Sequence, residues 1–330
     1  MRSTTLRAAM LCLGVLFGAS LGSGDAAAQA FPTKQPIKVI IPFPAGGPTD
    51  AVARVIAERF GTVLHQTVVI ENRGGGAGGS VGAKVVAAAE PDGYTILLTP
   101  GGPLTSGPAV HTNIGYDPAK VFTPVALLTE SPLIICVHPS VPAKTLAELV
   151  AYAKANPGKL TWGTQGFGTG AHLIAAMFNS EAGVDILNVP YRGTAPALAA
   201  ILAGEVQIIV DASTTVLTHI EAGKVRALAV TGSERFSKLP DVPTAAEVGY
   251  PKLVAPFWLG VVAPAGTPPA IVDKLNAAFR EALAAPEVQA RLAGFGAEIK
   301  IGTPADFGKL LTNELAQWSA VAKAANIKAD

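Results

Sequence analysis

Short apolar runs alternate with longer stretches of helical period along most of the chain. Alternation of this kind is typical of βαβ units and of mostly parallel sheets. The short runs predict strands at residues 37–41, 67–70, 95–98, 133–137, 186–189, 206–210, 227–230 and 259–262. The longer stretches predict helices at residues 50–60, 80–89, 146–155, 171–181, 195–203, 215–221, 269–284 and 304–325. The pattern therefore predicts an α/β fold with mostly parallel sheets flanked by helices.

One series of elements occurs twice along the chain. A strand, a Gly-rich loop, a helix, a second strand and an Arg-Gly pair follow one another in each half. The spacing is 26 residues from Gly47 to Arg73 and again 26 residues from Gly166 to Arg192. Two copies of one α/β unit favour two similar domains that face each other.

Ligands of open α/β sheets bind at the carboxyl ends of the strands, so we expect a cleft between these domains. The Ala- and Leu-rich helices at the end of the chain carry no Gly-rich loop and should complete the first domain. The predicted first domain comprises residues 31–127 plus 253–330, and the second comprises residues 128–252. The two crossing segments would act as a hinge.

The first 30 residues have the pattern of a secretory signal. Arg2 and Arg7 form a basic start, residues 8–21 are apolar, and Ala28-Gln29-Ala30 is a small-x-small site. We expect cleavage after Ala30 and a periplasmic protein. No later apolar run reaches the roughly 18 residues that a membrane helix needs.

The amino-acid composition excludes several classes of protein and partner. Of the 330 residues, 49% are apolar and 15% are charged, and the formal net charge is +1, which excludes a disordered or polybasic chain. We therefore expect no nucleic-acid partner and no anionic-membrane partner. Removal of the signal segment would leave Cys136 as the only cysteine, so no intramolecular disulfide is expected. An acidic ligand would have to be held by local geometry.

The strongest local feature is a strand that passes through a Gly-rich turn into a helix, at residues 41–50. The first-turn amides of a helix have no acceptor within it, and glycine lets a ligand approach the backbone, so this turn suits an anionic oxygen such as a carboxylate. An ordinary turn with a Thr or Asp cap is the alternative. The candidate ligand-binding residues here are Phe43, Ala45, Gly46, Gly47, Thr49 and Asp50.

A second Gly-rich loop, at residues 163–172, repeats this arrangement. Its hydroxyls and amides could donate to an anion, and Phe167 could form an apolar wall. A capping role for Thr169, core packing for Phe167 and a structural role for His172 are the alternatives. The candidates in this loop are Thr164, Gly166, Phe167, Gly168, Thr169 and His172.

Two further sites complete the predicted set. Tyr191, Arg192 and Gly193 follow a strand and open a helix, where Arg192 could hold a carboxylate through two hydrogen bonds or form a surface salt bridge. Asp211 ends an apolar strand and could accept from a ligand hydroxyl or amine, or cap the next helix.

Other motif matches carry less weight. Residues 74–79 fit a dinucleotide-binding pattern, but they follow the second strand of their unit, and glycine-rich segments match by chance. Ser80 matches a hydrolase motif without lying on a sharp strand-to-helix turn. The five histidines lack metal-ligand spacing, so we expect no metal and no cofactor.

Several separated motifs together are similar to one family. They are PFPAGGPTD at residues 42–50, VVIENRGGGAGG at 68–79, PDGYTILL at 91–98, PGKLTWGTQGFGTGAH at 157–172, VPYRGTAPA at 189–197, RALAVT at 226–231, LPDVPTAAEVG at 239–249 and APAGTP at 263–268. In these motifs the chain resembles the periplasmic solute receptors of tripartite tricarboxylate transporters, also called Bug (Bordetella uptake gene) receptors.

The resemblance implies a two-domain Venus-flytrap fold of periplasmic-binding-protein type, no catalysis, and delivery of a small carboxylated solute to a membrane permease. It implies that the two Gly-rich loops hold the carboxylate through amides, hydroxyls and bridging water, with Tyr191, Arg192, Gly193 and Asp211 bordering the pocket. Asp50 would repel a bound anion, so we assign it to capping or to a water or amine contact.

The chain departs from the family pattern at a few positions. Gly74 replaces a common Pro, Thr164 and Thr169 replace a frequent Ser, and Arg192 replaces a common Lys. We expect the first change only to loosen a turn, and the others to affect pocket volume. We expect a monomeric receptor for a small organic acid. The alternatives are an exported hydrolase that uses Ser80 and a sensory receptor for a membrane kinase.

Overall fold

The structure, a computed structural model, describes residues 31–111, 113–324 and 327. The expected signal segment, residues 1–30, lies outside these residues, as does residue 325 at the end of the last expected helix. In the described part of the chain, no helix combines the length and the apolar content that crossing a membrane requires.

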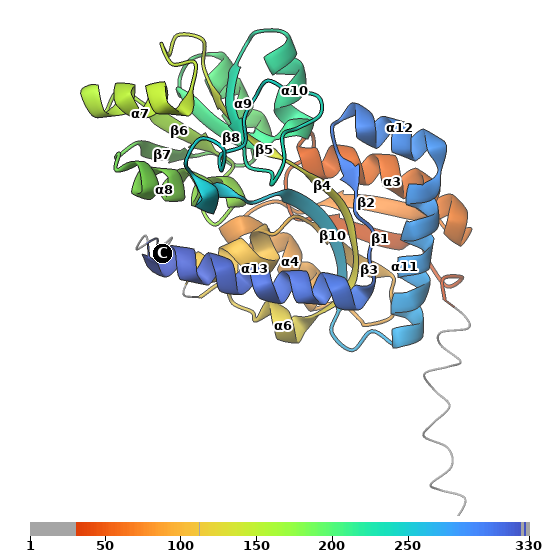
Figure 1. Ribbon diagram of the computed structural model, residues 1–330. Coiled ribbons are helices and arrows are strands. Elements are labelled where there is room, and N and C mark those ends of the chain that lie inside the picture. Colours follow the sequence, from red (N-terminus) through yellow and green to blue (C-terminus); the bar gives the residue numbers. More distant parts are fainter. Residues whose placement is uncertain (1–30, 112, 325–326, 328–330) are drawn as a thin grey trace, which may run out of the picture.

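The fold is built on two β-sheets with helices packed around them (Figure 1). The first sheet has the order β11 (Glu298–Ile299), β4 (Phe122–Ser131), β10 (Phe257–Pro264), β3 (Thr95–Thr99), β1 (Ile37–Ile41) and β2 (Val68–Asn72). The second sheet has the order β7 (Leu187–Pro190), β6 (Thr161–Thr164), β8 (Ile208–Ala212), β5 (Leu133–Val137) and β9 (Arg226–Val230).

Both sheets are mixed rather than mostly parallel. The pairs β1–β2, β1–β3, β6–β7 and β6–β8 are parallel, as the βαβ pattern predicts. In contrast, β10 is antiparallel to β3 and β4, and β5 is antiparallel to β8 and β9. The antiparallel strands include β4, β5 and β10, which lie where the chain passes from one sheet to the other. Such crossings need no helical connection, so the alternating pattern could not indicate their direction.

The predicted helices correspond to observed ones within a few residues. These are α3 (Pro48–Leu64), α4 (Ser80–Ala87), α7 (Leu146–Ala155), α8 (Gly170–Ala182), α9 (Thr194–Leu202), α10 (Ser213–Glu221), α11 (Pro269–Ala284) and α13 (Pro304–Ala324). β6 is the strand that the repeat places before the second Gly-rich loop. The structure adds elements that were not assigned from the sequence: β4, β11, α5 (Gly107–Val110), α6 (Pro118–Val121), α12 (Pro286–Gly294) and the short segments η1 (Ala77–Gly79), η2 (Gly102–Ser106) and η3 (Pro251–Leu253).

Helices cover both faces of each sheet. On the first sheet, α3 and α11 pack on one face, where the rings of Phe60 and Phe279 stack with centroids 4.0 Å apart, and α4 and α13 pack on the other. On the second sheet, α7 and α8 cover one face, and α9 and α10 cover the other. Burial on both faces explains why the strands read as continuous apolar runs.

The chain crosses between the sheets near two points. β4 ends at Ser131 in the first sheet and β5 begins at Leu133 in the second, so the first crossing is at Pro132. The return follows Ala255, which is buried in the second core, and precedes Phe257 at the start of β10. We propose that the two domains divide at these crossings, a few residues from the predicted limits of 31–127 plus 253–330 and 128–252.

The last helix also connects the two parts. α13 runs along the first sheet, where Phe307 packs on Trp258 of β10 with ring centroids 5.4 Å apart. Near its other end, Trp318 and Ala322 are buried in the core of the second sheet, and α13 reaches α8 (Figure 1). The C-terminal helix therefore packs on both domains.

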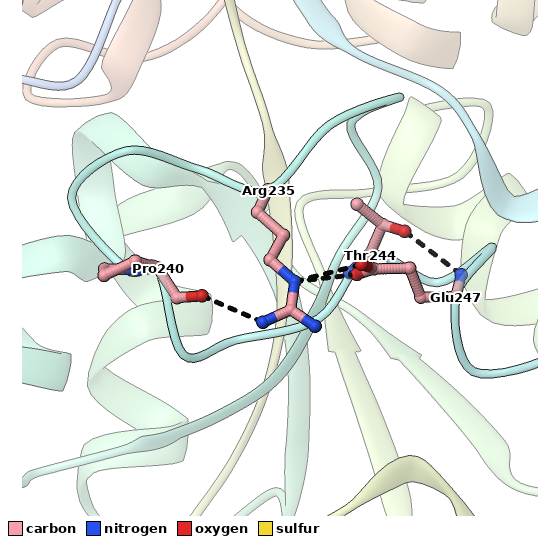
Figure 2. A network of polar contacts seen from close by, with 4 residues as sticks. All are labelled: Arg235, Pro240, Thr244 and Glu247. Atoms are coloured by element: carbon pink, nitrogen blue, oxygen red, sulfur yellow. Dashed lines mark hydrogen bonds and ion pairs between the residues drawn. The ribbon is translucent and has the colours of Figure 1, made fainter.

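A polar network fixes the loop that follows β9 (Figure 2). Arg235 donates through Nε to both carboxylate oxygens of Glu247, each at 3.0 Å, and through Nη1 to the Pro240 carbonyl at 3.0 Å. Glu247 also accepts from the Thr244 amide at 2.7 Å, and its own amide donates to Thr244 Oγ1 at 3.1 Å. These bonds give the motif at residues 239–249 a structural role.

A substitution at Gly260 tests how tightly α13 packs on β10. A Cβ at this position would overlap the Phe307 ring, so we expect Gly260→Ala to lower the free energy of unfolding by about 1–3 kcal/mol through overpacking. Gly294→Ala is the matched control, because a Cβ there meets no atom within 4 Å, and we expect a change of at most about 0.5 kcal/mol. Urea denaturation measures both, and equal effects would contradict this packing.

Candidate ligand-binding site

A cavity of about 90 Å³ lies between the two sheets. By the same measure a single water needs roughly 10–15 Å³, so the cavity has room for several waters or a small organic molecule. Its walls come from both domains and from the segments that join them, including residues 43–45, 47–49, 100–102, 169–171, 192–196 and 255–258. The cavity therefore occupies the place that the paired loops predict.

Three helices begin at this cavity. Thr49 of α3, Gly170 and Ala171 of α8, and Thr194 and Ala195 of α9 all line it, and each lies in the first turn of its helix. First-turn amides have no acceptor within their own helix, and the helix dipole adds positive potential at the same end. The cavity wall thus offers amide donors from both domains to one anionic group.

The first loop is held in place from behind by Asp50. Its Oδ2 accepts from the Gly46 amide at 3.0 Å and from Arg54 Nε at 3.1 Å. Burial by itself would raise the pKa of Asp50, but the bonds from Arg54 and the loop backbone outweigh it and hold the pKa below its ordinary value. Asn72 Nδ2 donates to the Phe43 carbonyl at 3.1 Å. Asp50 therefore shapes the loop and does not line the cavity.

Gly74, which departs from the family pattern, packs against this first loop. A Cβ on Gly74 would come within 2.9 Å of Pro44 Cδ. Glycine in place of the common Pro therefore affects the position of the first loop as well as the turn that contains Gly74.

The second loop is closed by hydrogen bonds of its own. Thr169 Oγ1 donates to the Gly166 carbonyl at 2.8 Å and accepts from the His172 amide at 3.4 Å, which makes Thr169 the cap of α8. Thr164 Oγ1 donates to Asn188 Oδ1 at 2.8 Å, toward β7. Phe167 is 46% exposed, and its ring meets the ring of His172 edge to face. This loop therefore presents the start of α8 to the cavity.

The two domains touch beside the cavity. The Gly78 amide donates to the Phe167 carbonyl at 3.1 Å, and Ser106 Oγ donates to the Gly168 carbonyl at 2.8 Å. A Cβ on Gly193 would come within 3.2 Å of the Pro44 ring, so these two loops also approach closely. The two domains are therefore in direct contact beside the cavity.

Three charged groups line the cavity. Arg192 is exposed, and among the described residues it has no ion-pair partner. Asp211 is buried, and Glu314 is partly buried. Burial raises the pKa of Asp211 to about 6, although donors on Gln165 and Ala212 lower it in part. Burial also raises the pKa of Glu314.

The structure brings half of the predicted residues onto the cavity wall. Those that line it are Phe43, Ala45, Gly47, Thr49, Thr169, Arg192, Gly193 and Asp211. The others lie on the same segments without lining it: Gly46, Asp50, Thr164, Gly166, Phe167, Gly168, His172 and Tyr191.

Several lining residues were not predicted from the sequence. They are mainly Gln165, Thr194, Trp258, Glu314 and Trp318. The start of α9 continues the predicted Tyr-Arg-Gly segment and could have been found by extending it. Glu314 and Trp318 come from α13, whose sequence has no loop motif, so no local signal points to them.

The residues of the rejected motifs do not form a competing site. Ser80 is buried at the start of α4 and does not line the cavity. Over the described ranges, no group of three or more His, Cys, Asp or Glu side chains could hold a metal ion.

The chain is similar to one family and to several solved structures. A family model described as tripartite tricarboxylate transporter family receptor matches residues 52–327. The structure of periplasmic binding protein BugD is 38% identical, covers 89% of this chain and 99% of its own, and has a TM-score of 0.84.

Two further structures come from Rhodopseudomonas palustris. Rpa4515 with adipate is 37% identical, covers 90% of this chain and 99% of its own, and has a TM-score of 0.85. MatC with bound malate is 38% identical, covers 88% of this chain and 99% of its own, and has a TM-score of 0.84. These likenesses confirm the predicted two-domain fold of periplasmic-binding-protein type.

His172 links this site to the pH dependence of stability. Burial, with nearby His111, lowers the pKa of His172 to about 4, so between pH 4 and its ordinary pKa the unfolded chain binds the extra proton. We therefore expect stability to fall as the pH is lowered through this window, by about 3 kcal/mol between pH 7 and pH 4. The raised pKa of Asp211 acts in the opposite direction between about pH 4 and 6, because there the folded protein holds the proton.

The measurement is urea denaturation from pH 7 to pH 4 for the wild type and for His172→Asn. The difference between the two curves removes the contribution of Asp211, which both proteins share. Parallel curves would show that His172 titrates normally.

Proposed function

We propose that this chain, which belongs to the tripartite tricarboxylate transporter family of receptors, captures a small organic carboxylate between its two domains and delivers it to a membrane permease. The observation that carries this proposal is the convergence of three helix N-termini, from both domains, on one cavity. Because the amides come from both domains, a single carboxylate would hold the domains together.

The chain is a receptor and not an enzyme, since the family and the similar structures are binding receptors. The alternative of an exported hydrolase that uses Ser80 is therefore wrong. The buried position of Ser80, away from the cavity, agrees with this conclusion.

The strength of the proposed binding follows from the donors present. A hydrogen bond to a charged group contributes about 1.5–3 kcal/mol, and each helix N-terminus adds about 0.3–1 kcal/mol. Three or four such contacts, after the cost of ordering the ligand, are consistent with roughly micromolar binding, about 8 kcal/mol. Malate in MatC and adipate in Rpa4515 are both small carboxylates, which supports the same ligand class for this chain.

Transport requires the chain to work outside the inner membrane and to open again. The signal-like residues 1–30, proposed to be cleaved after Ala30, and the receptor family support a periplasmic location. The crossings at Pro132 and after Ala255 are the proposed hinge. We propose that the permease recognises the closed monomer and releases the solute by opening it.

Calorimetric titration with aliphatic and aromatic mono- and dicarboxylates tests this function. We expect at least one acid to bind with a Kd near the micromolar range, and Arg192→Gln to weaken it about tenfold, or about 1.4 kcal/mol, because one charge-assisted contact is lost. Arg291→Gln is the matched control, since Arg291 makes the same charge change away from the cavity.

The result that would refute the proposal is that no carboxylate binds the wild type more tightly than millimolar. If both arginine variants bind the acid equally weakly, Arg192 does not contact the ligand, and the loss of affinity comes from the change in net charge.

A further inference from the structure

Asp211 is a buried acid on the cavity wall, and one of its oxygens has no hydrogen-bond partner. It ends β8, is 2% exposed, and lines the cavity. Its Oδ1 accepts from the Ala212 amide at 2.8 Å, whereas its Oδ2 is buried without a hydrogen-bond partner. A buried carboxylate oxygen is costly to leave unpaired, so this position is prepared for a donor.

No neighbouring side chain makes a hydrogen bond to Oδ2 in this structure. The amide group of Gln165 lies near enough to lower the pKa of Asp211, and its Nε2 donates to the Val210 carbonyl at 2.8 Å. The Thr194 and Thr215 hydroxyls lie near enough to lower the pKa of Asp211, yet neither makes a hydrogen bond to Oδ2. Oδ2 therefore lacks a hydrogen-bond partner in a residue that lines the cavity.

Glu314, the second acid that lines the cavity, differs from Asp211 in its hydrogen bonds. Glu314 Oε2 accepts from Thr105 Oγ1 at 2.7 Å, and its Oε1 accepts from Trp258 Nε1 at 2.9 Å. Both oxygens are thus occupied by the protein itself, and Glu314 ties α13 to β10 and η2. Of the two acids, Asp211 alone has an acceptor left for a ligand.

The charges of the cavity favour two kinds of ligand group. Helix N-termini and Arg192 favour a carboxylate of the ligand. A second acceptor, such as a keto oxygen or another carboxylate, would face the lone pairs of Asp211 and be repelled. A hydroxyl or an ammonium group would complete the missing hydrogen bond.

We propose that Asp211 makes the receptor specific for carboxylates that carry a hydrogen-bond donor, a hydroxyl or an ammonium group, within reach of its Oδ2. This inference rests on the proposed function and adds the substrate class. It makes hydroxy acids and amino acids the preferred solutes, and plain or oxo acids the poorer ones.

The test uses sets of acids that differ in a single group. On a three-carbon and a five-carbon scaffold, the set contains the unsubstituted acid, the hydroxy acid, the amino acid and the oxo acid, with the group at carbon 2 and at carbon 3. Calorimetry on the wild-type protein should show at least one hydroxy or amino acid binding at least tenfold more tightly than its unsubstituted and oxo counterparts. Comparing the hydroxy and amino members tells which donor the site prefers.

Asp211→Asn is the informative variant, because it keeps an oxygen for the Ala212 amide and replaces the open acceptor by a donor. We expect it to reduce the advantage of the hydroxy or amino acid to less than threefold and to improve binding of the oxo acid. Asp117→Asn is the matched control, because it makes the same change at an exposed acid that does not line the cavity, and there the ratio of the affinities should stay as in the wild type.

Each outcome decides the inference. Equal affinities within every set in the wild type would overturn it and leave the proposed function intact, as would an undiminished ratio in folded Asp211→Asn. If no acid binds at all, the proposed function and this inference fail together. Circular dichroism establishes that each variant is folded, and the wild-type series is decisive without the variants.

Discussion

The structure depends on backbone amides that helices cannot satisfy by themselves. Where α3, α8 and α9 begin, first-turn residues from two domains line one small cavity, and a group with negative oxygens is a suitable partner for their unpaired amides. Such a site needs glycines and threonines more than basic side chains, because the backbone itself provides the positive potential. A chain with a formal charge of only +1 can therefore hold the carboxylate that we propose as its ligand.

Small residues also set how closely the domains approach. Gly78 and Gly168 bring backbone groups of the two domains within hydrogen-bond distance of their partners, and a Cβ on either would come within about 3 Å of the opposite loop or its neighbour. The loops that we propose to bind the ligand are therefore also the loops through which the two domains touch.

Much of the fold and part of the candidate site could be predicted from the sequence, because they depend on local patterns. The apolar runs placed most strands, and the Gly-rich turns at residues 41–50 and 163–172 indicated both walls of the cavity. Sequence spacing could not show that Thr164 faces β7 or that Asp50 supports its loop from behind, since those directions depend on packing. Nor could it bring Glu314, more than 200 residues from the Thr105 hydroxyl it binds, to the same wall.

The C-terminal helix has a mechanical consequence. α13 is anchored on β10 through Phe307, while Trp318 and Ala322 are buried in the other core. Swinging the domains apart would expose part of this apolar surface to water, and the burial of one large side chain is worth about 1.5–3 kcal/mol. We infer that this helix resists a wide separation of the two domains.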